Sequence, residues 1–171
     1  MILRVQDLLG RQQPLALQGS LDMSDRFRKS RDVQPLEPIQ WQLTAQHADR
    51  TITLTGELKG RVRLLCSRCA DSFEDFCAFS FEERFRLVNL TDSPADDEDE
   101  IVPLTEDAID LDDLIGQEFI VQLPFAPLCS ESCRGLCPNC GVNRNEQSCD
   151  CRTERFDPRL EALQNWFKSD S

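Results

Sequence analysis

Cysteine is the residue whose number and spacing could do chemistry in this sequence. The chain holds nine cysteines, five of them within residues 133–151, CRGLCPNCGVNRNEQSCDC. The odd count fits a complete disulfide framework poorly. The N-terminus shows no secretory signal pattern, and no apolar run approaches the roughly 18 residues of a membrane span. We therefore expect a soluble, cytoplasmic protein, in which clustered cysteines more often bind metal or act in catalysis than form disulfides.

The most specific spacing in the chain is CPNCG followed by CDC, within residues 137–151. Cys-Pro-x-Cys-Gly is typical of tetrathiolate zinc, because the proline fixes one backbone angle and the glycine accommodates the turn after the second ligand. The two cysteines of CDC could complete the tetrahedron in a loop with almost no apolar core. Structural zinc would stabilise such a loop. The expected ligands are Cys137, Cys140, Cys149 and Cys151.

Two further cysteine pairs could form a second site. Cys66 and Cys69 lie in LLCSRCA, where a predicted strand ends, and Cys129 and Cys133 lie in LCSESC. The remaining Cys77 occupies an inward position in a phenylalanine-rich strand and is interpreted as a small core residue. Eight cysteines are then left, enough for two zinc ions per chain. Two alternatives stay open: a zinc ribbon that joins CSRC to CPNC, and a chain in which only one site is filled.

No pattern in the sequence singles out a catalytic centre. An all-thiolate zinc site has no open position for water or substrate, so it is structural. The single histidine, His47, falls in a predicted hairpin turn, and no Ser-His-Asp arrangement or phosphate loop is found. A thiol oxidoreductase acting through Cys66 and Cys69 is a weaker alternative, because a thioredoxin-like dithiol opens a helix in a βαβ unit, whereas this pair follows antiparallel strands. The chain is expected not to be an enzyme.

Alternating hydropathy predicts several antiparallel strands. Segments 39–46, 51–58 and 61–66 alternate apolar with polar residues, with HADR as one turn signal and Lys59-Gly60 as the turn of a second hairpin. A fourth strand is expected within 72–88, where phenylalanines alternate with charged residues. These phenylalanines are interpreted as sheet core rather than as a base-stacking platform: Phe73, Phe79, Phe81 and Phe85.

Helical spacing occurs in two segments. In IDLDDLIGQEFIVQLP, Asp110 is the expected N-cap and apolar residues recur at helical intervals until Pro124. DPRLEALQNWF predicts a last helix with Asp157 as its cap. The opening LRVQDLLG indicates a short strand or helical turn docked on the core, and residues 10–35 are polar with few periodic apolar positions. The expected fold is α+β: an antiparallel β-sheet, one or two packed helices and a C-terminal Cys-rich zinc knuckle.

Two domains are expected, a sheet and helix core at 1–128 with an acidic loop at 91–100, and a Cys-rich zinc-binding module with the C-terminal helix at 129–171. The formal charge is −12, but residues 91–113 hold eleven Asp and Glu and no Lys or Arg. The acidic block is interpreted as a solvated loop or as a contact for a basic ribosomal protein. Local cations are weak candidates for RNA or partner contacts: Arg26, Arg28, Lys29, Arg31, Arg61, Arg63, Arg68, Arg134 and Arg144.

The stretches CSRCADSFE, IDLDDLIGQEFIVQLPFAPLCSESCRGLCPNCGVNRN, CDC and DPRLEAL together resemble the DUF177 family, the YceD-type proteins of bacteria and plastids. The likeness covers most of the chain from about residue 36 onward. It implies a role in accumulation of large-subunit ribosomal RNA, and it supplies no catalytic residues. Within the family the first CxxC is general, whereas the CPxCG knuckle belongs to a subset, which favours treating the knuckle as a separable module.

The combined interpretation is a non-enzymatic ribosome assembly factor with structural zinc sites. Its expected partners are a large-subunit precursor particle, rRNA or a basic ribosomal protein, with no membrane and no small-molecule substrate. A zinc-stabilised protein that binds free rRNA is the alternative, and net acidity weighs against it because strong nonspecific affinity for RNA needs positive charge.

Overall fold

The computed structural model describes residues 1–11, 13–87, 101–104 and 108–151. It divides into two compact units, Met1–Leu65 with Ser72–Pro127, and Cys66–Asp71 with the chain from Leu128 onward. The second unit thus joins two stretches that the boundaries 1–128 and 129–171 had placed in separate domains. The acidic loop expected at 91–100 and the helix expected at 157–167 lie outside the described residues.

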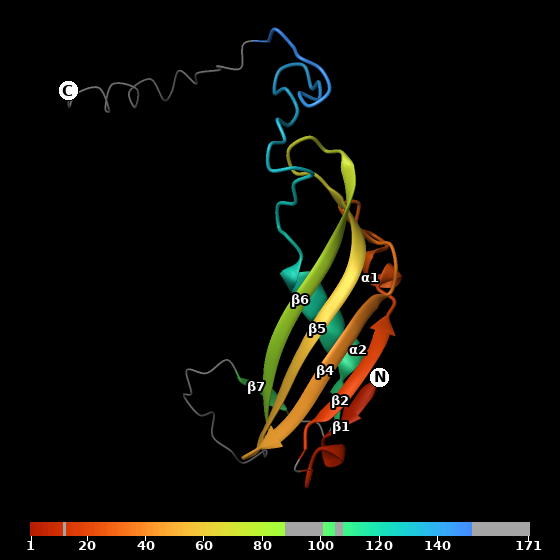
Figure 1. The fold of residues 1–171 in the computed structure, drawn as a ribbon, viewed down its shortest axis with the longest axis vertical. Coiled ribbons are helices and arrows are strands. Elements are labelled where there is room, and N and C mark those ends of the chain that lie inside the picture. The colour runs from red at the N-terminus through yellow and green to blue at the C-terminus, as the bar shows by residue number, and fades with distance from the viewer. Residues whose placement is uncertain (12, 88–100, 105–107, 152–171) are drawn as a thin grey trace, which may run out of the picture. The chain divides into compact units, whose positions relative to one another are not determined.

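A mixed sheet dominates the first unit, with strand order β2-β4-β5-β6-β7 (Figure 1). Strand β3 also pairs with β5. Every neighbouring pair is antiparallel except β6 and β7, which are parallel. A separate antiparallel pair is formed by β1 and β8. The strands are β1 (Ile2–Arg4), β2 (Leu15–Leu21), β3 (Val33–Pro35), β4 (Ile39–Ala48), β5 (Thr51–Leu65), β6 (Ser72–Leu87), β7 (Ile101–Leu104) and β8 (Ala108–Asp110). The helices are η1 (Val5–Asp7, 3-10), α1 (Ser24–Phe27) and α2 (Leu111–Gln122). The fold is therefore α+β, as the sequence predicts.

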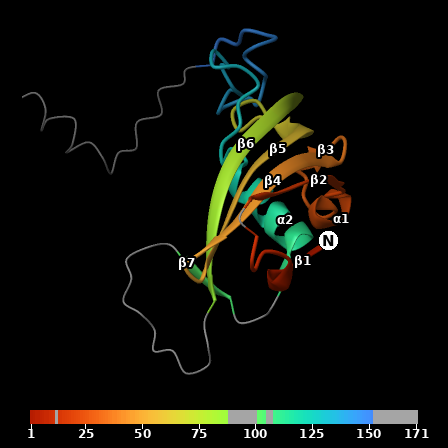
Figure 2. The same cartoon turned by 60° about the horizontal axis from the view of Figure 1, so that its bottom comes forward.

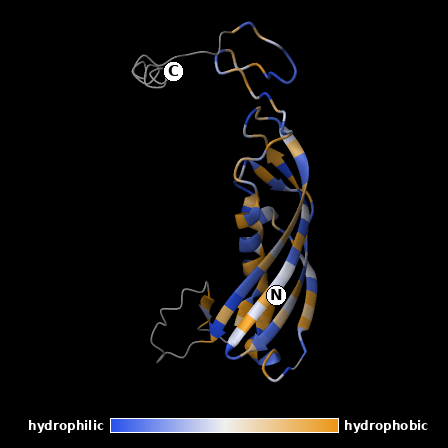
Figure 3. Cartoon of the chain, turned by 60° about the vertical axis from the view of Figure 1, so that its left-hand side comes forward, coloured by the Kyte–Doolittle hydropathy of each residue, from blue (hydrophilic) through white to orange (hydrophobic). Residues whose placement is uncertain are grey.

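The core lies on one face of the sheet, where alternate residues of the long strands are buried. Figure 3 shows this alternation along the strands as changing colour. On β5 the even-numbered positions point inward, with Leu54, Leu58 and Val62 fully buried. The expected phenylalanines of β6 and Cys77 all belong to this core cluster or pack against it. The opening residues also dock there, as β1 followed by η1, with Leu3, Val5 and Leu8 buried.

Helix α2 covers the buried face of the sheet (Figure 2). Asp110 caps it as predicted, because its Oδ1 accepts a hydrogen bond from the Asp112 amide at 3.0 Å. Apolar residues at helical spacing face the core, and the ring of Phe119 meets Phe79 of β6 edge-on with centroids 5.6 Å apart. The helix ends at Gln122, before the proline that the sequence marked as its limit.

The hairpin expected at Lys59-Gly60 is wrong. Strand β5 runs unbroken through both residues, which pair with β4 or β6 neighbours. Gly60 is a place of close approach, because a Cβ built there would clash with Cδ1 of Ile39. The turn predicted at HADR is confirmed: β4 and β5 are joined by Asp49-Arg50, where both residues have positive φ, 48° and 68°, as one class of two-residue hairpin turn requires. His47 therefore lies in β4, opposite Ile52, and not in the turn.

Residues 10–35 are more ordered than their composition suggests. They contain β2, α1 and β3, and β2 pairs along its whole length with β4. Its side chains alternate between half-buried and exposed, so only Leu15, Leu17 and Leu21 mark it as a strand. Met23, just after β2, is fully buried. An edge strand buries less apolar surface than a central one, and this weakens its periodic signal.

Candidate metal centres

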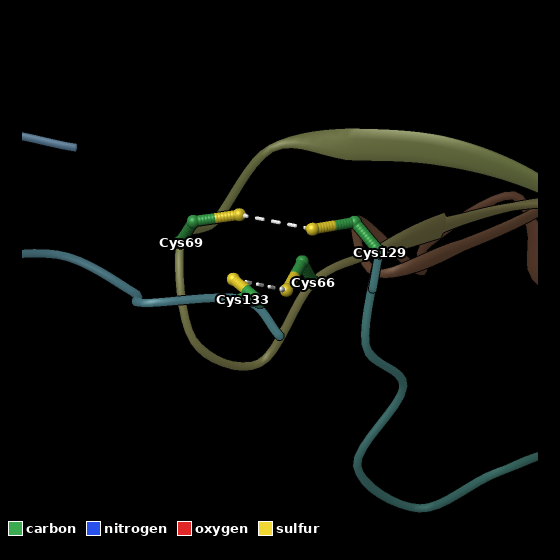
Figure 4. Close-up of side chains that lie close together, drawn as sticks. All are labelled: Cys66, Cys69, Cys129 and Cys133. Carbon is green, nitrogen blue, oxygen red and sulfur yellow. Dashed lines mark hydrogen bonds between the residues drawn. The ribbon is translucent and has the colours of Figure 1, made fainter. Parts of the chain in front are cut away.

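Four sulfur atoms converge in the second unit, where the first tetrad consists of Cys66, Cys69, Cys129 and Cys133 (Figure 4). All four sulfurs lie within 4.8 Å of one another. Two separations are 3.8 Å, between Cys66 and Cys133, and 3.6 Å, between Cys69 and Cys129. A zinc ion with four sulfurs at about 2.3 Å places them about 3.8 Å apart, whereas a disulfide needs about 2.05 Å. The spacing is that of a metal site.

The knuckle loop 66–71 presents the first two sulfurs. The Cys66 amide donates to the carbonyl of Asp71 and the Ala70 amide donates to the carbonyl of Cys66, both at 2.9 Å. These bonds close a tight loop that requires a left-handed residue, and Ala70 takes that conformation with φ of 59°. The loop lets two thiols of one CxxC face a common point, while its amides face the sulfurs.

The second tetrad consists of Cys137, Cys140, Cys149 and Cys151, again with all sulfurs within 4.8 Å. Its knuckle loop 137–142 repeats the hydrogen bonds of the first loop. The Cys137 amide donates to the carbonyl of Val142 at 2.8 Å, and the Gly141 amide donates to the carbonyl of Cys137 at 2.9 Å. Gly141 has a φ of 75°, so it occupies the position that Ala70 takes in the first loop. CSRC and CPNC are therefore two copies of one local structure.

Backbone amides prepare one thiol in each knuckle loop for metal. Burial acts to raise the pKa of Cys66, but amides of Cys129, Cys69 and Arg68 outweigh it and lower that pKa to about 6. Amides of Cys140 and Asn139 likewise lower the pKa of Cys137 to about 6. Cys151, by contrast, shares a hydrogen bond with Cys140 that raises its pKa to about 12. A metal binding here would displace the remaining protons.

Side chains outside the tetrads brace their ligand loops. The Arg68 guanidinium donates from Nη1 to the carbonyl oxygens of Cys133 at 3.0 Å and Glu131 at 3.3 Å. Asn145 donates from Nδ2 to Sγ of Cys133 at 3.3 Å, and Asn143 donates from Nδ2 to Oδ2 of Asp71 at 2.6 Å. The asparagine bond to Cys133 is the largest of the causes that lower the pKa of that thiol.

The structure brings the eight cysteines together in the same two groups of four that counting suggested, and it does not form the zinc-ribbon grouping. All nine cysteines are free, and Cys77 lies in the sheet core. Sequence reasoning missed the asparagines and the part that Ala70 plays. One signal could have pointed to Ala70. It lies four residues after the first cysteine of CSRC, the position that Gly141 occupies after the first cysteine of CPNC.

The cations proposed for RNA or partner contacts are spread over both units, and several have carboxylate partners within the chain. Arg26 meets Asp113 at 3.0 Å, Arg61 meets Glu37 at 3.6 Å and Arg63 meets Glu74 at 3.0 Å. Arg68 is engaged in the second unit as described above. The exposed residues with no such side-chain contact among the described residues are Arg28, Lys29, Arg31, Arg134 and Arg144.

A mixed sheet backed by one long helix, together with a loop unit that carries two four-sulfur clusters, defines a small α+β protein with two sites that could hold metal ions. Four sulfurs fill a tetrahedral coordination sphere, so such sites suit a structural role. No helix among the described residues is long and apolar enough to cross a membrane.

The chain belongs to the YceD family, whose model, described as large ribosomal RNA subunit accumulation protein YceD, matches residues 54–166. This match includes every cysteine of both tetrads. No solved structure matches the chain at a significant level.

Three relatives illustrate the family. An uncharacterized protein of Mycobacterium tuberculosis is 28% identical over 121 residues, which are 71% of this chain and 58% of that protein. The Bacillus subtilis protein YlbN is 24% identical over 152 residues, 88% of this chain and 87% of the relative. An Arabidopsis thaliana protein named large ribosomal RNA subunit accumulation protein YCED homolog 1, chloroplastic, is 25% identical, with 75% of this chain and 48% of that protein covered. The chain thus spans less than three fifths of the mycobacterial relative.

Proposed function

We propose that this protein is a non-enzymatic assembly factor that promotes accumulation and maturation of large-subunit ribosomal RNA in the cytoplasm. The observation that carries the proposal is the family match over residues 54–166, whose description names large ribosomal RNA subunit accumulation. The printed name of the Arabidopsis relative agrees with it. The proposed partner is a large-subunit precursor particle, contacted through rRNA or through a basic ribosomal protein.

We further propose that each tetrad holds one Zn²⁺, two per chain. The support is the donor set: in each tetrad four thiol sulfurs lie within 4.8 Å of one another, and one thiol of each knuckle loop has a lowered pKa. Zinc suits four thiolates in a closed site and adds no redox chemistry. The ions would hold the loops of the second unit, where the described core is small. With no coordination position left for water or substrate, the centres support a structural and not a catalytic role.

The proposed contact surface for the particle includes the turn after α1. Arg28, Lys29 and Arg31 are exposed there, with no carboxylate partner among the described residues. Each free cation could neutralise one phosphate. The acidic segment 91–100 is proposed as a separate contact for a basic ribosomal protein.

Sedimentation of cell extracts tests the proposal. We expect the chain to comigrate with large-subunit precursors in a sucrose gradient, and its loss to reduce large-subunit rRNA. Replacement of Arg28, Lys29 and Arg31 by glutamine should weaken comigration. The matched control, glutamine at Arg50, Lys59 and Arg84, removes the same charge from residues that are already bonded within the chain. Salt-dependent binding to naked rRNA without comigration would favour the free-rRNA alternative, and a reversible disulfide at Cys66 or Cys69 would favour the oxidoreductase.

A further inference from the structure

The loop between the ligand pairs of the second tetrad reaches the first tetrad. Residues 141–148 separate Cys140 from Cys149, and Asn145 within this loop donates a hydrogen bond from Nδ2 to Sγ of Cys133 at 3.3 Å. Cys133 is a member of the first tetrad. One segment of chain therefore closes the second cluster and contacts a sulfur of the first.

The orientation of the Asn145 amide is fixed by its other contacts. Its Oδ1 accepts from the backbone amide of Arg134 at 2.8 Å, and its Nδ2 also donates to Oδ1 of Asn143 at 2.9 Å. Exchange of the oxygen and nitrogen would leave the Arg134 amide facing an NH₂ group and the Asn143 oxygen facing another oxygen. The donor must therefore point toward Cys133.

A second contact ties the same loop to the first knuckle. Asn143 donates from Nδ2 to Oδ2 of Asp71 at 2.6 Å, and Asp71 accepts the backbone bond that closes the loop after Cys66. The 141–148 loop thus contacts both segments that supply ligands to the first tetrad: the knuckle loop 66–71, through Asp71, and the segment 129–133, through Cys133. Hydrogen bonds that reach ligands from outside orient them and tune the metal.

We propose that the two metal centres are thermodynamically coupled, and that Asn145 is the positioning residue that couples them. This inference rests on the proposal that both tetrads bind zinc. Metal in the second tetrad fixes both ends of the 141–148 loop and so places the Asn145 donor against Cys133. The N–H bond stabilises the thiolate that the first ion requires, so filling the second site raises the affinity of the first.

Asn145→Asp tests the coupling with little change in shape. The substitution keeps the oxygen that accepts from Arg134, but it removes the donor and places a negative charge beside the sulfur cluster. Gln147→Glu is the matched control, because it adds the same charge in the same loop at an exposed side chain with no contact to either tetrad among the described residues. We expect Asn145→Asp to weaken zinc binding at the first tetrad about 10- to 100-fold, the range for such outer contacts, and Gln147→Glu to leave it unchanged.

Chelator titration followed by alkylation and peptide mapping reads each site separately, with Cys129 reporting the first tetrad and Cys140 the second. Cadmium-113 NMR of the cadmium-loaded chain adds a spectroscopic test. In Asn145→Asp we expect the resonance of the first tetrad to shift and that of the second to stay unmoved, a result that general destabilisation of the fold would not give. Equal weakening of both sites with both resonances unmoved would overturn the role of Asn145, as would equal effects of the two variants.

Reciprocity supplies an independent test that does not depend on one side chain. Cys149→Ser with Cys151→Ser should weaken zinc binding at the first tetrad, and Cys66→Ser with Cys69→Ser should weaken the second by the same factor. Unchanged affinities in both variants would overturn the coupling. Native mass spectrometry of the unaltered chain distinguishes the two proposals: fewer than two zinc ions would overturn the zinc proposal, whereas two ions with independent affinities would overturn the coupling alone.

Discussion

Each tetrad has its own knuckle loop, and the two loops have the same local structure. The tetrads differ in the length of chain that separates their ligand pairs. In the first tetrad, Cys66 and Cys69 follow β5, whereas Cys129 and Cys133 come after α2, so that β6, β7, β8 and α2 lie between the two pairs in the sequence. In the second, all four ligands fall between residues 137 and 151. A metal in the first centre would therefore close a long loop of chain, and a metal in the second would close only a short one.

The tetrad whose ligands enclose the longer stretch of chain is also the more buried of the two. Three cysteines of the first tetrad are buried and one is exposed, whereas the second has one buried, two half-buried and one exposed. The knuckle of the second, less buried tetrad is the easier one to recognise in the sequence. CPNCG has the proline and glycine that suit the turn, whereas CSRCA has neither. The more recognisable motif thus marks the more local site, and the plainer motif marks the site that joins distant segments.

The largest effect is expected from removing one centre at a time. With zinc in excess, Cys66→Ser with Cys69→Ser should lower the melting temperature of the chain far more than Cys149→Ser with Cys151→Ser. The reason is that a cross-link over a long loop restricts the unfolded chain more than one over a short loop. Circular dichroism melting, with zinc counted by native mass spectrometry, makes the measurement. Equal shifts for the two variants would break the comparison.

A smaller effect is expected from exchanging the left-handed residues. Gly141→Ala places a Cβ in open space but at a φ of 75°, so it should cost about 1 kcal/mol, or about fivefold in zinc affinity of the second tetrad. Ala70→Gly relieves the same strain at a φ of 59° and should strengthen the first tetrad by at most that amount, since glycine is freer in the unfolded chain. Chelator competition measures both. A loss of affinity in Ala70→Gly would show that the methyl group has a packing role.

Much of the fold was predictable because burial imposes a period on the sequence. Strands β4 and β5 bury every second residue over most of their length, and α2 buries a stripe, so their patterns are clear. Strand β6 keeps the same phase, with Cys77, Phe81 and Phe85 buried. The turn expected at Lys59-Gly60 failed because glycine marks close approach of Ile39 there, although the unbroken phase from Leu58 to Val62 was a sign of one continuous strand. Strand β2 was missed because an edge strand buries few apolar residues.

The grouping of the cysteines was predictable from counting, but the contacts between the groups were not. Four sulfurs per ion and one cysteine in a core strand leave eight ligands for two sites, and the short spacing within residues 137–151 favoured the grouping that the structure shows over a zinc ribbon joining CSRC to CPNC. Asn143 and Asn145, however, act through hydrogen bonds to residues that are not their neighbours in the sequence. Asn143 bonds to Asp71, 72 residues away, and Asn145 bonds to Cys133, 12 residues away. Asparagine in a polar loop resembles any turn residue, so only the folded chain reveals these bonds.

The smallest effect is expected from replacing Arg68. This side chain links the knuckle loop 66–71 to the segment 129–133, the two segments that supply ligands to the first tetrad, and so it tests a contact that belongs to that tetrad alone. Its guanidinium donates to the carbonyl oxygens of Glu131 and Cys133. Arg68→Gln should weaken zinc binding there by about two- to threefold, because one exposed and one part-buried hydrogen bond are lost and neither reaches a sulfur. Arg144→Gln is the matched control, because that side chain makes no such contact among the described residues while its backbone does. Chelator competition with alkylation mapping gives the affinities. If both variants leave the first tetrad unchanged but weaken comigration with precursor particles, Arg68 acts at the partner surface and not within the metal centre.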